Sequence, residues 1–414
     1  MRVGGGKGAR GRGGKNTVRG AGSATAWHRR TRRTITLAIL LVAATASAQT
    51  PAETASTAFK DDVHAAAGFG CTACHAGAAA GAYAPTPRTA IAPMCATCHS
   101  DAALMRKFDP QVRVDQFLQY ETSTHGKRMA SGETRVATCT DCHGAHGVRR
   151  VSDPRAPVAP LNVTTTCGRC HGDPGRMKAF GREATPPADW GASVHATALL
   201  KRGDASAPTC VACHGSHGAT PPGVTAVANV CAQCHLREAE LFRASVKKDI
   251  FDAIGQAECL VCHNNHRIEP PADHWVGVQE GAVCAQCHDA STDSGKTIVG
   301  IRSELDRLAS AMSEADALLT RAERAGMLVD DGRLAFREAR EHHVQSHVLV
   351  HTFAADQFGK AAAEGLASAQ RAHEAGEAAL QEIQVRRRGL AAATLLVVAF
   401  LIALGLKIRS LGPG

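Results

Sequence analysis

The chain is poor in aromatic residues, which make up 4% of its 414 residues and include only two tyrosines. Residues 61–293 also lack long periodic apolar segments, and proline and glycine interrupt them repeatedly, as at Pro221-Pro222-Gly223. Such residues mark turns and loops, whereas apolar side chains are the usual material of a folded interior. This region therefore cannot fold around an ordinary hydrophobic core, and something other than side chains must fill it.

The chain carries no excess of one charge once its first 48 residues are set aside. Its formal net charge is +9, but residues 1–48 contain ten Lys and Arg and no Asp or Glu. The remainder has 37 basic and 38 acidic residues. This balance excludes the basic surface that a nucleic-acid partner would require.

Cysteine is absent outside one repeated pattern, because all 16 cysteines belong to eight copies of Cys-x-x-Cys-His. This pattern attaches c-type haem: the two thiols form thioether bonds to the porphyrin, and the next histidine becomes the proximal iron ligand. Paired cysteines of a structural zinc site would explain the thiols but not the histidine after every pair. The sequence therefore predicts eight covalently bound c-type haems. The cysteine pairs are Cys71 and Cys74, Cys95 and Cys98, Cys139 and Cys142, Cys167 and Cys170, Cys210 and Cys213, Cys231 and Cys234, Cys259 and Cys262, and Cys284 and Cys287; the proximal histidines are His75, His99, His143, His171, His214, His235, His263 and His288.

Residues 61–293 divide into four diverged units of two motifs each. The first cysteines of a unit lie 24, 28, 21 and 25 residues apart in units one to four. The hexapeptide Val-Cys-Ala-Gln-Cys-His occurs at 230–235 and again at 283–288, which indicates a modular array built by duplication. We expect the porphyrins to form the core, with short helices carrying the motifs and loops around them, and the apoprotein not to fold.

Seven further histidines in this region are candidate distal iron ligands. Three of them follow a proximal histidine by three residues, and this short tether suits a neighbouring haem better than the residue's own haem. Their number predicts bis-histidine coordination, which is typical of electron transfer, rather than seven surface histidines. They are His64, His125, His146, His195, His217, His266 and His274.

The fourth unit departs from the pattern. Ala192-Ser193-Val194-His195 has its counterpart in Ala244-Ser245-Val246-Lys247, where lysine replaces histidine. Three alternatives follow for the eighth iron. The C-terminal domain donates a histidine, namely His351 or His347; Lys247 or Lys248 binds after burial deprotonates it; or the iron stays open to a small molecule.

Residues 294–388 are predicted to form an antiparallel helical bundle. Apolar residues recur in steps of three and four from residue 298 to 322, and we expect Gly326 and Asp330-Asp331-Gly332 to break this run. A second helix is expected over Arg333–Val350 and a third from Ala355, continuing into the apolar run Leu390–Leu406. That run of about 17 residues is near the lower limit for a helix that crosses a bilayer. The alternatives are a buried helix or a segment that lies in the membrane interface, and the flanking cations favour an anchor. The histidines of the second helix form either a haem-facing stripe or a solvated face.

The termini predict an exported, membrane-anchored protein. Basic residues, the apolar stretch Ile35–Ala46 and Ala46-Ser47-Ala48 are typical of a signal peptide, here 1–48. We expect a linker at 49–60, the octahaem domain at 61–293, the bundle at 294–388, a single C-terminal transmembrane anchor at 389–409 and a short cytoplasmic tail at 410–414. The protein would then lie on the periplasmic face of the inner membrane.

The haem motifs, the two Cys-His-Gly-x-His-Gly segments and the anchor resemble the periplasmic multihaem c-type cytochromes of respiring bacteria. The resemblance implies a mainly α fold with extensive loops, and electron transfer between the quinone pool and periplasmic or extracellular acceptors. It also implies redox protein partners and a quinone-reactive membrane subunit, such as a b-type cytochrome. The alternative is an oxidoreductase of nitrite, hydroxylamine or a sulfur compound, acting at one open or lysine-ligated haem. No motif ends in lysine, and Tyr83 and Tyr120 have no supporting motif, so no catalytic residue is assigned.

Overall fold

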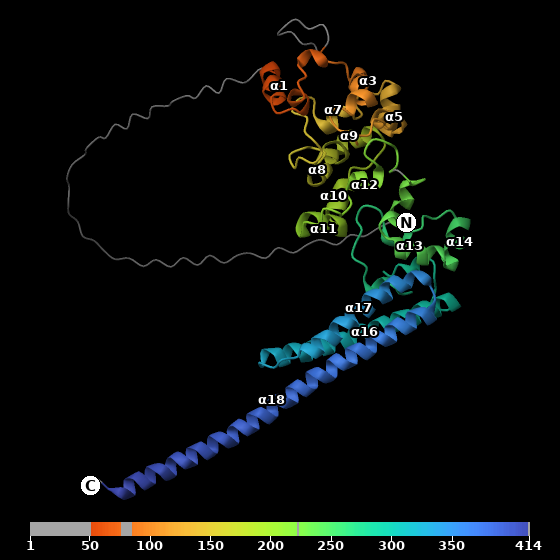
Figure 1. The fold of residues 1–414 in the computed structure, drawn as a ribbon. Helices are drawn as coiled ribbons and strands as arrows, with labels where there is room; N and C mark the ends of the chain where they lie inside the picture. Colours follow the sequence, from red (N-terminus) through yellow and green to blue (C-terminus); the bar gives the residue numbers. More distant parts are fainter. Residues whose placement is uncertain (1–50, 76–84, 222, 413–414) are drawn as a thin grey trace, which may run out of the picture. The chain divides into compact units, whose positions relative to one another are not determined.

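The computed structural model describes residues 51–75, 85–221 and 223–412. Within these ranges the chain forms α-helices and 3-10 helices (η) joined by loops, and no β-strand (Figure 1). This confirms the predicted mainly α fold. The predicted signal peptide and Tyr83 lie outside the described residues.

The helices are short in the haem region and long after residue 292. They are α1 (Pro51–Phe59), α2 (Val63–Ala66), η1 (Cys71–Ala73), α3 (Arg88–His99), α4 (Ala102–Met105), α5 (Gln116–Thr122), α6 (Thr124–Ala130), α7 (Cys139–His143), α8 (Pro160–His171), α9 (Pro174–Ala179), α10 (Pro186–Gly191), α11 (Val194–Arg202), α12 (Cys210–His214), η2 (Val227–Gln233), α13 (Leu236–Arg243), α14 (Val246–Ala253), α15 (Leu260–His263), η3 (Asp273–Trp275), η4 (Cys284–Gln286), α16 (Asp293–Arg324), α17 (Asp330–Leu349), η5 (Val350–Thr352) and α18 (Ala355–Leu411).

The attachment motifs themselves set the ends of several short helices. Helix α7 consists of one motif and ends at Gly144, where φ is +86°. Helix α12 ends in the same way at Gly215, where a Cβ atom would lie 2.9 Å from the Thr220 carbonyl oxygen. In the fourth unit Asn264 takes this position with φ of +65°, and asparagine is one of the few other residues that tolerates positive φ. In these three motifs the residue after the proximal histidine thus turns the chain away from the motif.

The haem region has little apolar core of its own. Its one cluster of buried apolar residues among the described part of the chain is small and contains Trp190, Ala196 and Leu199. The other two clusters lie mainly in the C-terminal helices. This distribution agrees with the expectation that side chains alone do not fill the interior of the haem region.

Helices α16, α17 and α18 pack along one another (Figure 1). Leu305, Leu308 and Leu319 of α16 and Phe358 of α18 are almost completely buried between them. A buried leucine or phenylalanine stabilises the folded state by about 1.5–3 kcal/mol relative to an exposed one. The three helices therefore have the apolar core that the haem region lacks.

The predicted helix break at Asp330-Asp331-Gly332 is wrong, because these residues form the first turn of α17. The two aspartates favour this position since a helix N-terminus carries a partial positive charge. Gly332 is buried there, and a Cβ atom on it would lie 2.5 Å from Leu319 Cδ2. The glycine permits close packing of α17 on α16 instead of ending a helix. The break at Gly326, where φ is +84°, is present between the two helices.

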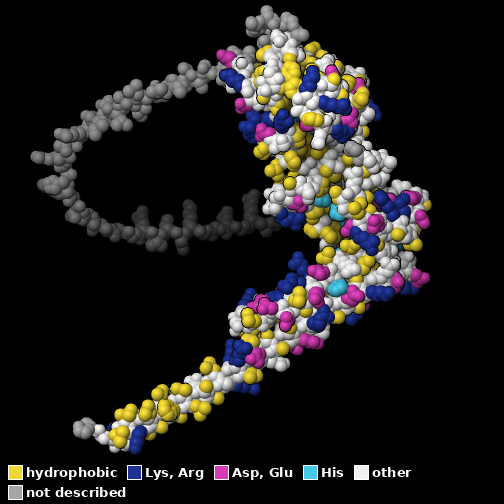
Figure 2. Space-filling model, viewed as in Figure 1, with side chains coloured by type: hydrophobic (Ala, Val, Ile, Leu, Met, Phe, Trp, Pro, Cys, Tyr) yellow, Lys and Arg dark blue, Asp and Glu magenta, His cyan; other side chains and the backbone are white. Residues whose placement is uncertain are grey.

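Helix α18 continues without interruption from the bundle into the apolar C-terminal run. Its most apolar window of 18 residues has a mean hydropathy of 2.6, and none of that window is buried. Figure 2 shows a nearly continuous apolar surface on this end of the helix. By length and composition it could cross a membrane, which is consistent with association with a lipid bilayer.

We predict that a chain ending at Arg388 is released from the membrane. The exposed apolar side chains after this residue would no longer be present to enter the bilayer. Fractionation of cells followed by haem staining should move the protein from the membrane to the soluble fraction. A chain ending at Leu411 is the matched control and should stay with the membrane. Membrane retention of the shorter chain would contradict an anchoring role for this part of α18.

Candidate functional site

Four short helices of the haem region begin with the same side-chain cap. The side chain of Asp62, Ser123, Ser193 or Ser245 accepts a hydrogen bond from a backbone N–H of the first turn. Such caps satisfy N–H groups that have no partner within the helix. The residue two positions after each cap is a nitrogen base. These bases are His64 of α2, His125 of α6, His195 of α11 and Lys247 of α14.

Each of these three histidines faces the proximal histidine of the second motif in its own unit. The ring centroids are 5.9 Å apart for His64 and His99, 6.0 Å for His125 and His171, and 6.3 Å for His195 and His235. The capped helix therefore supplies the partner of the second motif within one unit.

The histidines of the Cys-x-x-Cys-His-x-x-His segments face the first motif of the preceding unit. The ring centroids of His75 and His146 are 6.1 Å apart, with an angle of 21° between the rings. The corresponding distances are 6.1 Å for His143 and His217 and 5.9 Å for His214 and His266. These contacts join each unit to the next along the chain.

No further unit follows the fourth, and a residue of the C-terminal helices takes the corresponding place. His351 of η5 lies with its ring centroid 6.0 Å from that of His263, and the rings are 17° apart. Trp275 packs beside the same His263 ring at 5.6 Å between centroids. Phe353, which follows η5 with φ of +53°, packs against Phe242 of α13 at 6.4 Å. The turn that carries His351 is thus held against the haem region.

These distances fit two imidazoles that share one iron. A metal–nitrogen bond to histidine is about 2 Å long, which places two rings on opposite sides of one metal ion about 6 Å apart between centroids. The seven observed separations lie between 5.9 and 6.3 Å. They are too long for direct hydrogen bonds between the rings. The residues present therefore fit a bis-histidine haem at each of the seven positions.

Lys247 takes the place of the distal histidine in the fourth unit. Its Nζ lies 2.7 Å from Nε2 of His288, the last proximal histidine, and 5.4 Å from the ring centroid of Phe353. The neighbouring Lys248 points to carboxylates instead, with Nζ 2.5 Å from Asp252. The hydrogen bond from Lys248 to Asp252 raises the pKa of this lysine, so Lys248 remains a cation without a lone pair for iron.

Two of the predicted distal ligands, His274 and His347, do not face a proximal histidine. His274 is exposed, and within the described residues its ring makes no contact with a proximal histidine. His347 contacts the Asp273 carboxylate rather than a proximal histidine. The structure thus brings His351, and not these two histidines, to His263. Ligation by any of these residues stays a prediction.

Burial lowers the pKa of several of the paired imidazoles. The direction is the same for the proximal His99, His143 and His263 and for the facing His125 and His195, and desolvation is the main cause in each. A lowered pKa keeps the ring neutral at pH 7. Only a neutral imidazole has a nitrogen lone pair for a metal ion, so the electrostatics favour ligation.

Attachment motifs of successive units lie in contact. Helix α3, which ends in the second motif, packs on α7, which is the third motif. The neighbouring Cys95 side chain lowers the pKa of the free Cys139 thiol to about 7. Two further junctions are built in the same way. They join Cys167 to Cys210 and Cys259 to Cys231.

The two motifs within a unit are also neighbours. Burial raises the pKa of one cysteine of each first motif, and the sulfur of the second motif adds to this increase. All seven junctions between consecutive motifs are therefore close, from Cys71 to Cys287. The pairs within units are Cys74 and Cys98, Cys142 and Cys170, Cys213 and Cys231, and Cys262 and Cys284.

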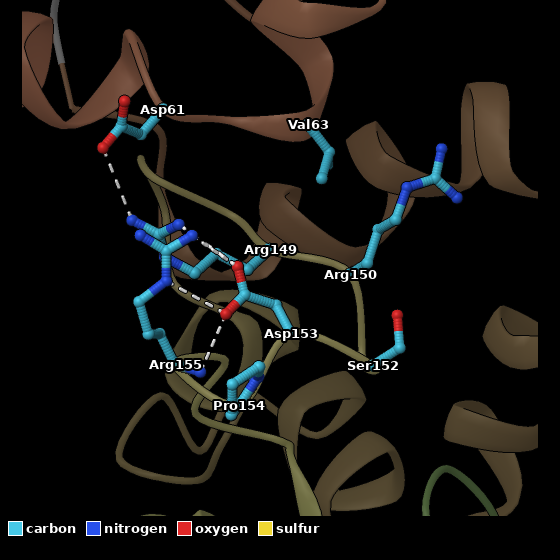
Figure 3. A pocket seen from close by; sticks show the side chains of 8 residues that line it. All are labelled: Asp61, Val63, Arg149, Arg150, Ser152, Asp153, Pro154 and Arg155. Carbon is cyan, nitrogen blue, oxygen red and sulfur yellow. Dashed lines mark hydrogen bonds and ion pairs between the residues drawn. The ribbon is translucent and has the colours of Figure 1, made fainter.

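A polar hollow of about 550 Å³ lies apart from the histidine pairs, at the start of the haem region (Figure 3). Arg149 bridges Asp61 at 3.6 Å and Asp153 at 3.3 Å, and Arg155 pairs with Asp153 at 2.8 Å. These opposite charges satisfy one another, and the hydrogen bonds from Arg155 hold the pKa of Asp153 well below its usual range. The hollow is a surface ion-pair network that ties two loops together.

Residues 63–172 and 201–289 match the family model for cytochrome c3. This match supports a multihaem c-type cytochrome over these segments. The cytochrome c3 match implies covalently bound c-type haem and electron transfer as the class of function. It leaves out residues 173–200, which include His195, and the C-terminal helices. Comparison with curated proteins and with solved structures gives no match.

The sequence contains a signal for the bases on the capped helices but none for the contact of His351. A short polar cap followed two residues later by a base occurs at Asp62, Ser123, Ser193 and Ser245. This spacing would have favoured Lys247 over Lys248 as a candidate ligand. It would also have shown that His274 does not follow a capping residue in this way. The contact between His351 and His263 has no such local signal, because 88 residues separate the two histidines.

We predict that His351→Ala converts one iron of the cytochrome from low-spin to high-spin without loss of attached haem. The substitution removes the imidazole that faces His263 but leaves Cys259, Cys262 and His263 in place. Electron paramagnetic resonance and a pyridine haemochrome assay measure the two quantities. His373→Ala is the control, because His373 pairs with Glu377 on the surface of α18. An unchanged low-spin spectrum in the His351 variant would exclude this histidine as a ligand.

Proposed function

We propose that the protein is an exported octahaem cytochrome that relays electrons along the periplasmic face of the inner membrane. The relay would run between a quinone-reactive membrane subunit, such as a b-type cytochrome, and periplasmic or extracellular acceptors. One observation carries the proposal: cysteines of consecutive attachment motifs lie near one another from the first motif to the eighth, and several of the helices that hold them pack together, as α3 does on α7 and α8 on α12.

The spacing of the motifs supports a relay because electron transfer falls steeply with distance. Bound haem would supply the reversible ferric and ferrous states that carry the electron. The cysteines of consecutive motifs would tether neighbouring haems, and the facing histidines would hold seven of the irons from both sides. Two nitrogen ligands on each iron change little between oxidation states, which favours transfer over binding of a small molecule.

The C-terminal helices support a location beside the bilayer. The exposed apolar end of α18 is the segment that would enter the membrane, and the bundle that contains it packs next to η5 and the last haem motifs. A single spanning helix offers no pocket for a quinone. We therefore infer a separate membrane subunit as the partner that exchanges electrons with the quinone pool.

Mass spectrometry of the purified chain tests the number of haems on which the relay depends. We predict a mature mass that contains eight covalent haems. A redox titration should then remove eight electrons, with the optical change spread over a range of potentials because the axial ligands and their burial differ. A mass with fewer haems would break the path at the empty motif and contradict a relay of eight.

Lys247 is the ligand that we infer for the iron held by His288. It occupies the same position after a capping residue as three histidines that face proximal rings, and its Nζ faces the His288 ring. At 2.7 Å the two nitrogens are hydrogen-bonded, so an iron between them would require them to move to about 4 Å apart. Only a neutral amine has a lone pair for iron, and Phe353 lies beside the Lys247 Nζ, 5.4 Å away from its ring centroid. If Lys247 were displaced, the same iron would become the open site of an oxidoreductase, which is the second candidate function.

We predict that Lys247→Ala makes one of eight irons high-spin and able to bind cyanide. Lys248→Ala is the matched control, because the adjacent lysine pairs with Asp252, and its spectrum should equal that of the unmodified protein. The measurement is cyanide titration followed by optical and magnetic spectroscopy. Cyanide, nitrite or hydroxylamine binding to the unmodified protein at one haem would instead support the oxidoreductase.

A further inference from the structure

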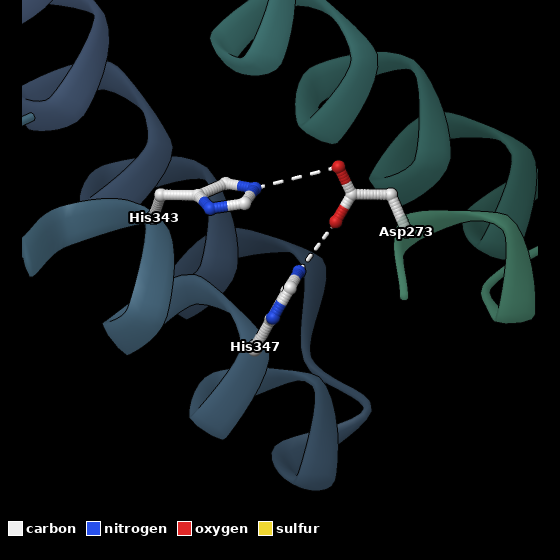
Figure 4. A group of neighbouring side chains, drawn as sticks. All are labelled: Asp273, His343 and His347. Atoms are coloured by element: carbon white, nitrogen blue, oxygen red, sulfur yellow. Dashed lines mark hydrogen bonds and ion pairs between the residues drawn. The ribbon is translucent and has the colours of Figure 1, made fainter. Parts of the chain in front are cut away.

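Three side chains with metal-binding atoms meet where the haem region touches α17, away from every histidine pair. Asp273 lies in η3, and His343 and His347 lie one turn apart on α17 (Figure 4). The His343 Nε2 is 3.4 Å from Asp273 Oδ2, and the His347 Nε2 contacts Asp273 Oδ1. One nitrogen or oxygen from each residue lies within 4.8 Å of the other two.

The composition of this group suits a divalent transition metal ion. Two imidazoles and one carboxylate form a known set of three ligands for zinc, to which a water molecule adds the fourth. Histidines four residues apart on a helix project from the same face, which allows both rings to reach one ion. Each of the three side chains is only 21–23% exposed, so the group is sheltered but still open to solvent on one side.

The charges around the group also favour a cation. Asp273 is acidic, and its two carboxylate oxygens face the two imidazoles, Oδ2 toward His343 and Oδ1 toward His347. Arg302 of α16 lies near Asp273, and its guanidinium is bound to Asp306 at 2.8 Å. Asp306 thus neutralises the Arg302 charge, and the negative charge of Asp273 remains available to a metal cation.

We propose that Asp273, His343 and His347 bind one divalent metal ion of the zinc type, which clamps α17 to the haem region. The ion would join η3, which follows the seventh motif, to the helix that leads into η5. His351 lies four residues after His347, so the clamp would also hold the register of α17 that brings His351 to His263. This site is independent of the relay and requires no assignment of a haem ligand.

Zinc binding to the haem-loaded full chain tests the clamp. After treatment with a chelator and its removal, equilibrium dialysis against zinc and elemental analysis should give one zinc per chain. Asp273→Asn and His343→Ala should each weaken zinc binding at least ~10-fold, because ligand loss costs more than the loss of an outer-shell partner. His342→Ala is the matched control, because this adjacent histidine faces Glu364 at 3.4 Å, and it should bind zinc normally.

A thermal measurement separates a lost site from a lost fold. Zinc should raise the melting temperature of the unmodified protein and of His342→Ala, and leave that of Asp273→Asn unchanged. The haem content and Soret band of each variant show whether it has folded. Absence of stoichiometric zinc in the unmodified protein, or equal zinc binding by a folded Asp273→Asn variant, would overturn the clamp whether or not the relay exists.

Discussion

The geometry of the haem region depends on one repeated arrangement, in which two nitrogen bases face each other across about 6 Å. Imidazoles at this distance gain nothing from direct hydrogen bonding, and burial removes them from water. Their positions are favourable only when a metal centre lies between them. The small apolar cluster around Trp190 cannot replace that contribution. Folding of residues 61–293 is thus expected to depend on haem in the way that small metal domains depend on their metal.

Two kinds of base face the proximal histidines, one within each unit and one between successive units. A capped helix supplies a base within a unit, whereas the histidine three residues after a proximal histidine reaches back to the unit before it. The first kind closes a unit, and the second joins it to its neighbour. A repeat array built in this way needs something different at its last unit. His351 occupies that place, so a residue of the C-terminal helices faces the fourth unit where a further unit would otherwise lie.

The last unit therefore differs from the others in both of its contacts. Its first motif faces a histidine from η5, and its second motif faces Lys247 instead of a histidine. Phe353 connects the two, because it follows His351 in the chain and lies 5.4 Å from Lys247 Nζ. The inferred metal clamp at Asp273 would hold the same end of α17. At this end of the haem region, the two unusual bases Lys247 and His351 lie where the haem region packs on the C-terminal helices.

The sequence by itself determined the cofactor, because Cys-x-x-Cys-His is a covalent pattern whose chemistry requires only five consecutive residues. It also determined the helical class and the position of the three long helices, since apolar periodicity and the run Leu390–Leu406 are local features. The Asp330-Asp331-Gly332 turn was misjudged because glycine and aspartate mark breaks unless a neighbouring helix packs closely on them, as Leu319 does on Gly332. Only the tertiary structure decided which base faces which proximal histidine. His351 and His263, like Asp273 and His343, are far apart in the chain, and no local propensity encodes a contact that depends on how whole helices pack.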